Sequence, residues 1–444
     1  MLTAQTESGA AESLLHRISD ARNKSDSLFS IVRPEALYDR PIPERHRIVF
    51  YVGHLEAFDW NLLHDNVFGI ESFHPEFDRL FAFGIDPVGG GGLPTDQPSD
   101  WPSLDRVREY VGTIRESLDE KLADVSRADA LHRDGFSLET LLNVAIEHRL
   151  MHVETLAYML HQLPLSRKTS VPASPPVLTS PVQPTMLEIT AGIARLGLSR
   201  GSRAFGWDNE FEAHTVDVPA FSMDRYMVSN GQFLAFIQDQ GYRRRELWRE
   251  ADWEWKDAAG ISAPVFWKNQ DGSWLYRTMF DEVPLPLDWP VYVSHAEASA
   301  YALWAGKALP TEAQWQRAAY GSQDNDARFY PWGNQAADET RGNFDFHSWD
   351  PTPVNAHPRG QSAFGVEGML GNGWEWTSTP FGPFPGFAPF PFYRGYSADF
   401  FDGKHYVMKG GSARTAACML RPTFRNWFQS HYQYVYAGFR CVND

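Results

Sequence analysis

Two histidines are spaced so that they could share one metal ion. His148 and His152 are four residues apart in the string EHRLMHVETLAYML, so on a helix both imidazoles project from one side about a turn apart. Apolar residues such as Val144 and Leu156 lie close to the same face, so both rings should point into the interior of a helical bundle. An unpartnered imidazole costs free energy there, and the two rings therefore need a shared partner.

A third histidine is expected to face the same interior from a different helix. His54 lies between Phe50 and Phe58 at four residues on either side, which predicts an inward-facing ring. A single buried histidine could be a core residue hydrogen-bonded to a carboxylate, whereas three inward-facing histidines favour a shared metal. Imidazoles without thiolates suit zinc, iron, copper or nickel, so the residues alone leave the metal open. Glu154 lies two residues after His152 and therefore cannot lie on the same face of the helix. We expect it either to contact the metal ligands without binding the metal itself or to tether the helix to the other domain.

Amphipathic helices must hold these histidines. Apolar residues recur at three- and four-residue spacing over 11–27, 44–66, 103–126 and 137–163, which predicts a four-helix bundle. The segment 166–184 follows, with five prolines and six Ser or Thr, and it is expected to be a linker. The predicted organisation is a helical bundle over 1–165, the linker over 166–184 and a second domain over 185–444.

The second half of the chain has a different character. Short β-prone runs alternate with clusters of Gly, Pro, Asn and Trp, and helical periodicity is confined to 229–240, 295–305 and 311–319. This pattern predicts an α+β domain rich in loops. The expected fold class is therefore α followed by α+β.

Composition narrows the classes of function. The chain has 444 residues, of which 43% are apolar, enough for sizeable cores. Its net charge of −16 would repel phosphate backbones and anionic headgroups, so nucleic acid and membrane surfaces are not expected partners. Only two cysteines occur, Cys418 and Cys441, which argues against a disulfide scaffold and a Cys-rich zinc site. The N-terminus lacks the pattern of a secretory signal, and a cytoplasmic location is expected.

Several strings in the second half resemble one known fold family. They are FGWDNE at 205–210, ALPTEAQWQRAA at 308–319, YPWGN at 330–334, GNGWEW at 371–376, KGGSA at 409–413 and AGFR at 437–440. Together they resemble the formylglycine-generating-enzyme fold, a variant of the C-type-lectin-like fold, from about Thr185 onward. The generating enzymes hold copper with a cysteine pair, whereas Cys418 and Cys441 flank a different pattern here. The resemblance therefore implies a shared scaffold rather than that activity.

The first half resembles the DinB-like bundle of ergothioneine-type sulfoxide synthases. It shares the region of His54 and the string with His148, His152 and Glu154, and both halves occur in the same order in that family. The resemblance implies an iron-dependent oxidoreductase that forms a C–S or C–Se bond oxidatively. It also implies Fe(II) bound by His54, His148 and His152, O2 as co-substrate and hercynine, the trimethylammonium betaine of histidine, as substrate. Three imidazoles on one side of an octahedral ion leave three positions for substrate, donor and O2.

The same resemblance assigns residues to the substrate. FRNW at 424–427 matches the family segment that holds hercynine, which makes Asn426 the partner of the carboxylate and Trp427 a ring face for the quaternary ammonium. YRGY at 393–396 resembles the segment with a proton-donating tyrosine. Tyr393 is therefore the candidate catalytic donor and Tyr396 a substrate neighbour.

The chain differs from some members of this family in the residues expected to bind the sulfur or selenium donor. Family members that use γ-glutamylcysteine have an arginine pair in the loop after the second helix and an acid directly after the Asn-Trp pair. Here no arginine lies between Arg79 and Arg106, and Phe428 follows Trp427. A charged donor would lose partners worth about 1.5 to 3 kcal/mol each.

A neutral, ring-shaped donor fits this sequence better. Phe428 would contact it, with polar groups from Asp86, Asp96 and Gln97. The string GIDPVGGGGLPTDQPSDWP resembles the selenoneine-synthase branch, which uses a selenosugar. Free cysteine is the alternative donor, because that branch also lacks the arginine pair. Two other classes remain open: a lectin-like binding module with structural histidines, and a zinc-dependent hydrolase or transferase.

Overall fold

The computed structural model describes residues 2–65, 67–82, 96–123, 135–169, 181–323 and 328–443, with the backbone alone over 2–13. The chain divides into two compact units. The first is Met1–Val171 together with Phe390–Tyr393, and the second is Pro172–Pro389 together with Arg394–Asp444. Within the described part of the chain, none of the helices combines the length and the apolar character needed to cross a membrane.

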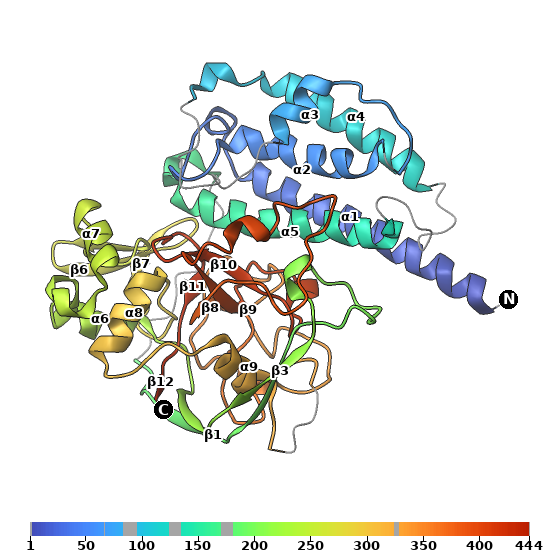
Figure 1. Ribbon diagram of the computed structural model, residues 1–444. Helices are drawn as coiled ribbons and strands as arrows, with labels where there is room; N and C mark the ends of the chain where they lie inside the picture. Colours follow the sequence, from blue (N-terminus) through green and yellow to red (C-terminus); the bar gives the residue numbers. More distant parts are fainter. Residues whose placement is uncertain are drawn as a thin grey trace. The chain divides into compact units, whose positions relative to one another are not determined.

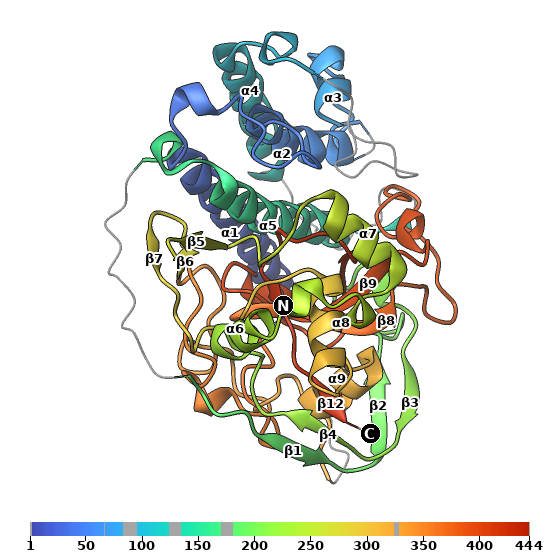
Figure 2. The same cartoon turned by 90° about the vertical axis from the view of Figure 1, so that its left-hand side faces the viewer.

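The first unit is built from helices. They are α1 (Leu2–Ser30), α2 (Ile48–Leu63), α3 (Pro75–Phe81), α4 (Leu104–Ala123) and α5 (Leu138–Gln162). α1 packs along α5, and α2 contacts α3, α4 and α5 (Figures 1 and 2). The four long helices confirm the prediction from periodicity, whereas the short helix α3 was not predicted. Of the predicted linker, residues 170–180 lie outside the described part of the chain.

Each helix of this unit reflects its pattern of apolar residues. α4 buries a single stripe at three- and four-residue spacing, which consists of Val107, Tyr110, Ile114, Leu118 and Leu122. α2 is buried on nearly every side, as expected of a helix at the centre of a bundle. Ser137 caps the N-terminus of α5, and its hydroxyl accepts a hydrogen bond from the Thr140 amide at 3.2 Å. α2 and α5 are the two helices that carry the predicted metal ligands.

The second unit mixes short strands and short helices. Its strands are β1 (Met186–Ile189), β2 (Gly192–Leu196), β3 (His214–Val218), β4 (Phe221–Asp224), β5 (Trp267–Gln270), β6 (Ser273–Arg277), β7 (Glu282–Pro284), β8 (Gly373–Pro380), β9 (His405–Gly411), β10 (Asn426–Gln429), β11 (Ala437–Gly438) and β12 (Val442–Asn443). Its helices are α6 (Asn230–Gln238), α7 (Glu250–Ala258), α8 (His295–Trp304) and α9 (Glu312–Tyr320). The α+β character predicted for this half is confirmed.

The strands of the second unit form small sheets. The described strands pair in the orders β10-β9-β8-β11, β1-β4-β12, β5-β6-β7 and β2-β3. α9 packs against β2 and β3 and also contacts β8 and β9. Its N-cap residue is Thr311, which forms a capping box with Gln314. The PTEAQW string is therefore the start signal of this helix.

The prediction of helices in the second half was incomplete. The three predicted segments are α6, α8 and α9, but α7 was missed. The buried side chains of α7 include Asp252 and Lys256, so no apolar stripe marks its inward face. Asp252 pairs with Arg249 and His431, and the Lys256 Nζ lies 4.2 Å from the Trp253 ring centroid. A helix whose inward face is charged cannot be found from apolar periodicity.

Two of the motif strings meet in the core of the second unit. Arg440, from AGFR, and Glu375, from GNGWEW, form an ion pair at 2.6 Å, and both side chains are fully buried. Trp315 donates its indole N–H to the same carboxylate at 3.1 Å. These residues hold β8, α9 and the C-terminal segment together, which explains why the strings mark the scaffold.

Candidate metal centre and substrate-binding residues

The three predicted ligands lie together inside the first unit. His54 comes from α2, and His148 and His152 come from successive turns of α5. All three are buried, with 2 to 8% of each residue exposed. One candidate ligand atom from each lies within 4.8 Å of the others. The arrangement joins two helices that are far apart in sequence.

The ring nitrogens of these histidines fit a shared metal ion. Nδ1 of His54 donates to the carbonyl of Phe81 at 2.6 Å, which leaves Nε2 unprotonated. That Nε2 has no hydrogen-bond partner in the described residues. The Nε2 atoms of His148 and His152 are 3.1 Å apart. Two nitrogens bound at about 2.1 Å and at a right angle to each other would be about 3 Å apart, so the spacing suits one ion.

Burial keeps these imidazoles in the form that binds metals. Desolvation lowers the pKa of His54 to about 4, and the positive charges of His46 and Arg149 act in the same direction. Burial also lowers the pKa of His148 and of His152 well below the ordinary value, and neighbouring histidines add to the effect. The rings are therefore neutral near pH 7 and can offer lone pairs.

Aromatic rings pack around the three histidines. Phe58 stacks on His148 with centroids 3.4 Å apart, and Phe50 stacks on His54 at 4.8 Å. Tyr393 belongs to the same unit, although it lies far along the chain. Its ring centroid is 6.1 Å from that of His148 and 5.2 Å from that of Phe58. The structure thus places the predicted proton donor beside the predicted ligands.

A buried ion cluster links the two helices that carry the histidines. Arg149 of α5 donates to Glu56 at 2.8 Å and to Asp59 at 2.7 Å, and both carboxylates belong to α2. Burial alone would raise the pKa of Glu56, but Arg149, Arg115 and Arg22 lower it to about 2. For Asp59 burial dominates and raises the pKa. This cluster was not predicted from the sequence, because its members lie about 90 residues apart.

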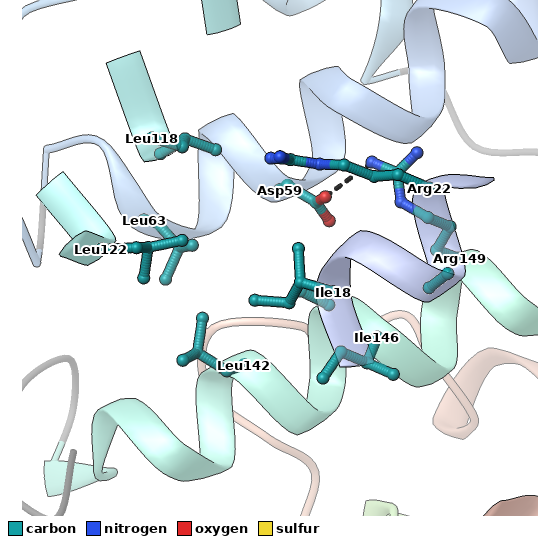
Figure 3. A pocket seen from close by; sticks show the side chains of 11 residues that line it. Ile18, Arg22, Asp59, Leu63, Leu118, Leu122, Leu142, Ile146 and Arg149 are labelled. Carbon is teal, nitrogen blue, oxygen red and sulfur yellow. Dashed lines mark hydrogen bonds and ion pairs between the residues drawn. The ribbon is translucent and has the colours of Figure 1, made fainter. Parts of the chain in front are cut away.

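A small cavity of about 10 Å³ lies beside this cluster, room for about one water molecule. Figure 3 shows Asp59 and the arginines on one side and aliphatic side chains such as Leu142 and Ile146 on the other. Oδ1 of Asp59 has no hydrogen-bond partner in the described residues. A water molecule there would satisfy it.

The residues predicted to hold hercynine belong to the second unit. Asn426, Trp427 and Phe428 are successive residues of β10 and pair with Met408, Val407 and Tyr406 of β9. Asn426 and Phe428 therefore share one face of the strand, and Trp427 lies on the other. The Asn426 Oδ1 accepts a hydrogen bond from the Trp427 amide at 2.9 Å.

Trp427 lies in a cluster of aromatic rings. Its indole stacks on Phe381 at 4.1 Å, with 5° between the planes. The Tyr396 ring lies at 5.4 Å, with 79° between the planes, and Phe400 lies at 5.8 Å. Tyr396 itself stacks on the fully buried Trp207. Trp427 and Tyr396, predicted to contact the same substrate, are therefore neighbours.

Comparison with known proteins identifies the family. The family model described as a sulfatase-modifying factor enzyme 1-like domain matches residues 174–444, and that of the DinB superfamily matches residues 17–156. A hercynine oxygenase of Mycobacterium tuberculosis is 39% identical, covering 84% of this chain and 83% of that protein. A hercynine oxygenase of Mycolicibacterium thermoresistibile is 38% identical, and the match covers 97% of this chain and 94% of that protein. The chain belongs to the hercynine oxygenase family.

More distant relatives extend the comparison. Ergothioneine biosynthesis protein 1 of Neurospora crassa is 28% identical, covering 92% of this chain and 55% of that protein. Among solved structures, PvdO from Pseudomonas aeruginosa matches with a TM-score of 0.39 and 18% identity, covering 58% of this chain and 93% of that one. Membership of the hercynine oxygenase family makes the chain an enzyme. It also confirms the expected fold class, a DinB-like bundle followed by a formylglycine-generating-enzyme-like domain.

The residues expected around the donor are only partly described. Asp86 lies outside the described residues. Asp96 pairs with Arg47 at 2.9 Å and with Arg40, and it accepts a hydrogen bond from Trp101. Arg40 and Arg47 come from about 50 residues earlier, outside the loop, and were therefore not expected there. Asp96 is thus part of an ion cluster with Arg40 and Arg47, and its contact with a donor stays a prediction.

Proposed function

We propose that this protein is a non-haem iron(II) enzyme that uses O2 to join sulfur or selenium to the imidazole of hercynine. The observation that carries the proposal is the convergence of three neutral, buried imidazoles in a hercynine oxygenase relative. His54, His148 and His152 would hold the ion. Their donor set suits iron, which would supply the redox chemistry that an O2-dependent bond formation needs.

The remaining predicted residues have separate tasks in this proposal. Tyr393 donates a proton from its hydroxyl during the reaction, a role that its ring contacts with His148 and Phe58 support. Asn426 donates its side-chain N–H to the substrate carboxylate. Trp427 offers its ring to the trimethylammonium group. Tyr396 positions the ring of Trp427, which it contacts.

We further propose a selenosugar as the donor. Phe428 stands where an acid would bind an amino-acid donor, and the chain has no arginine between Arg79 and Arg106. Arg40 and Arg47 lie beside this segment, but Asp96 pairs with both. An amino-acid donor would therefore leave its ammonium and carboxylate groups poorly compensated on binding, whereas a sugar carries neither group.

Donor competition tests the proposed reaction. Protein loaded anaerobically with Fe(II) would receive hercynine and equal amounts of a selenosugar, a thiosugar, cysteine and γ-glutamylcysteine, followed by O2. Mass spectrometry would identify the adducts. We expect the selenosugar or thiosugar adduct to dominate, and Phe428→Asp to shift the products toward amino-acid donors. A dominant γ-glutamylcysteine adduct would contradict the charge argument, and a dominant cysteine adduct would make the protein a cysteine-dependent sulfoxide synthase.

Iron content tests the metal centre separately from turnover. His148→Ala combined with His152→Ala should reduce iron bound per chain from one to near zero after anaerobic loading and desalting, while the far-ultraviolet circular dichroism stays unchanged. His161→Ala, at another buried histidine of α5, is the matched control and should retain iron. Full iron occupancy in the double variant would contradict the assignment of His148 and His152 as iron ligands.

A further inference from the structure

A segment rich in phenylalanine and proline precedes the proposed proton donor. It reads FGPFPGFAPFPF over 381–392, directly before Tyr393. Residues of this segment up to Pro389 belong to the second unit, whereas Phe390–Tyr393 belongs to the first. The proposed function uses Tyr393 but gives no task to the rings directly before it.

The earlier rings of the segment pack inside the second unit. The ring centroid of Phe384 lies 4.5 Å from that of His214, and the centroid of Phe387 lies 5.0 Å from that of Phe401. This part of the segment therefore contributes to the packing of the second unit.

The last rings of the segment pack on the helical unit instead. The centroids of Phe390 and Phe392 lie 5.4 and 5.0 Å from that of Phe136, in the edge-to-face arrangement that aromatic pairs favour. Phe390 and Phe392 also stack on each other at 5.1 Å. Phe136 directly precedes Ser137, the N-cap residue of α5. We call the cluster of Phe136, Phe390 and Phe392 the aromatic anchor.

A tight turn connects the aromatic anchor to Tyr393. The Tyr393 amide donates to the carbonyl of Phe390 at 3.0 Å. Pro391 occupies the second position of this four-residue turn, where its fixed φ is favoured. Because the turn has little freedom, holding the rings of Phe390 and Phe392 also limits where Tyr393 can lie.

Tyr393 makes a second set of contacts close to the predicted metal ligands. Its ring centroid lies 5.2 Å from that of Phe58, which stacks on His148. His148 lies roughly 15 Å along α5 from Leu138, the first residue of that helix. The turn thus contacts the helical unit at two separate places, which restricts its rotation as well as its position.

Position is critical for a proton donor. A hydroxyl transfers its proton within hydrogen-bond reach of the acceptor, about 2.6 to 3.2 Å. Misplacement by about 1 Å can lower a rate roughly a hundredfold. Tyr393 lies far along the chain from the helices that carry the histidines, so packing contacts must supply its position.

We propose that the aromatic anchor positions the hydroxyl of Tyr393 for proton transfer. Phe136, Phe390 and Phe392 are positioning residues, because none of them is assigned to iron, hercynine or the donor. The inference rests on the proposed function, since it takes Tyr393 as the proton donor. The position of Tyr393 can be measured without turnover, however.

Fluorine NMR of the full-length protein without iron tests this position. A 3-fluorotyrosine at residue 393 reports the ring currents of its aromatic neighbours. We expect its signal to differ from that of unfolded protein, and Phe136→Ala or Phe392→Ala to move it toward the unfolded value. Phe136→Tyr keeps the ring and should keep the signal. Phe387→Ala is the matched control and should also keep it, because this ring of the same segment packs in the second unit.

Turnover tests the purpose of the position. With iron loaded and with saturating hercynine and selenosugar, Phe136→Ala and Phe392→Ala should each lower the rate of adduct formation roughly tenfold. Iron content and hercynine affinity should stay unchanged, as should the rate in Phe387→Ala. In a Tyr393→Phe background the same substitutions should have little effect on the residual rate, because the group that they position is already gone.

Two results would overturn the proposal. One is an unmoved fluorine signal in both Phe136→Ala and Phe392→Ala. The other is an equal fractional loss of rate in the wild-type and Tyr393→Phe backgrounds, because the rings would then act on general stability. Absence of the adduct in the wild type would contradict the proposed function instead, and the fluorine spectra would still decide whether the aromatic anchor holds Tyr393.

Discussion

The geometry of His54 depends on a glycine that binds nothing. Gly53 precedes it in α2, and a Cβ there would lie 2.6 Å from the ring of Phe81. The missing side chain lets Phe81 pack against the helix, and the carbonyl of Phe81 accepts the hydrogen bond that fixes the His54 tautomer. Residue 53 thus controls a ligand through a packing contact.

Gly53→Ala should therefore lower iron affinity. Alanine in a helix normally gains up to about 1 kcal/mol over glycine, but here overpacking should cost about 1 to 3 kcal/mol and displace Phe81. Gly112→Ala in α4 is the matched control, because nothing lies within 4 Å of a Cβ there. Chemical unfolding and anaerobic iron titration would measure both effects. Unchanged iron affinity in Gly53→Ala would show that the Phe81 carbonyl does not orient the ligand.

Trp427 is the residue at which substrate recognition can be tested most simply. Phe381 stacks on its ring and Tyr396 lies at a steep angle to it, so these contacts restrict the orientation of the indole before substrate binds. Trp427→Ala should weaken hercynine binding by about 1 to 2 kcal/mol, the value of a cation–π contact. Binding of histidine, which lacks the methyl groups, should change much less. Equal losses for the two ligands in titrations would argue for a packing role only.

At the level of elements, the ion cluster sets how α2 lies against α5. Arg149 contacts both Glu56 and Asp59, so its removal leaves two buried carboxylates without their main partner. Arg149→Met should cost about 3 to 5 kcal/mol of unfolding free energy. Asp59→Asn should cost less, because burial already raises the pKa of Asp59.

Iron titration of the same variants tests whether the cluster also positions the ligands. Arg149→Met should bind iron more weakly even where it is folded. Ser137→Ala, which removes the cap of α5, should cost about 1 kcal/mol of stability and leave iron affinity unchanged. If Arg149→Met retains wild-type iron affinity, the cluster stabilises the bundle without positioning the histidines.

The elements also show what a sequence can reveal. The long helices and the inward direction of His54, His148 and His152 follow from periodicity, because apolar spacing reports burial directly. α7 was missed, because its buried face carries Asp252 and Lys256. Pairing between distant charged residues has no local signature, which is why the contacts of Asp96 were not foreseen.

Across the whole molecule, the sequence strings that resemble the formylglycine-generating-enzyme fold include residues other than those assigned to the proposed reaction. GNGWEW and AGFR build the core through Glu375 and Arg440, and such residues identify a scaffold. The histidines, Tyr393 and β10 carry the proposed reaction. Because the strings lie in the scaffold, their resemblance predicts the fold in more detail than it predicts the identity of the donor. The predicted donor contacts include Asp86, which lies outside the described residues.

Oxygen uptake is the measurement that tests the central claim most directly. Protein loaded with Fe(II) would be mixed with selenosugar and either hercynine or histidine, and O2 consumption followed with an electrode. We expect rapid uptake with hercynine, at about one O2 per hercynine adduct found by mass spectrometry, and little uptake with histidine or with His54→Ala. Uptake that is the same without hercynine, or hercynine recovered unchanged, would contradict the account.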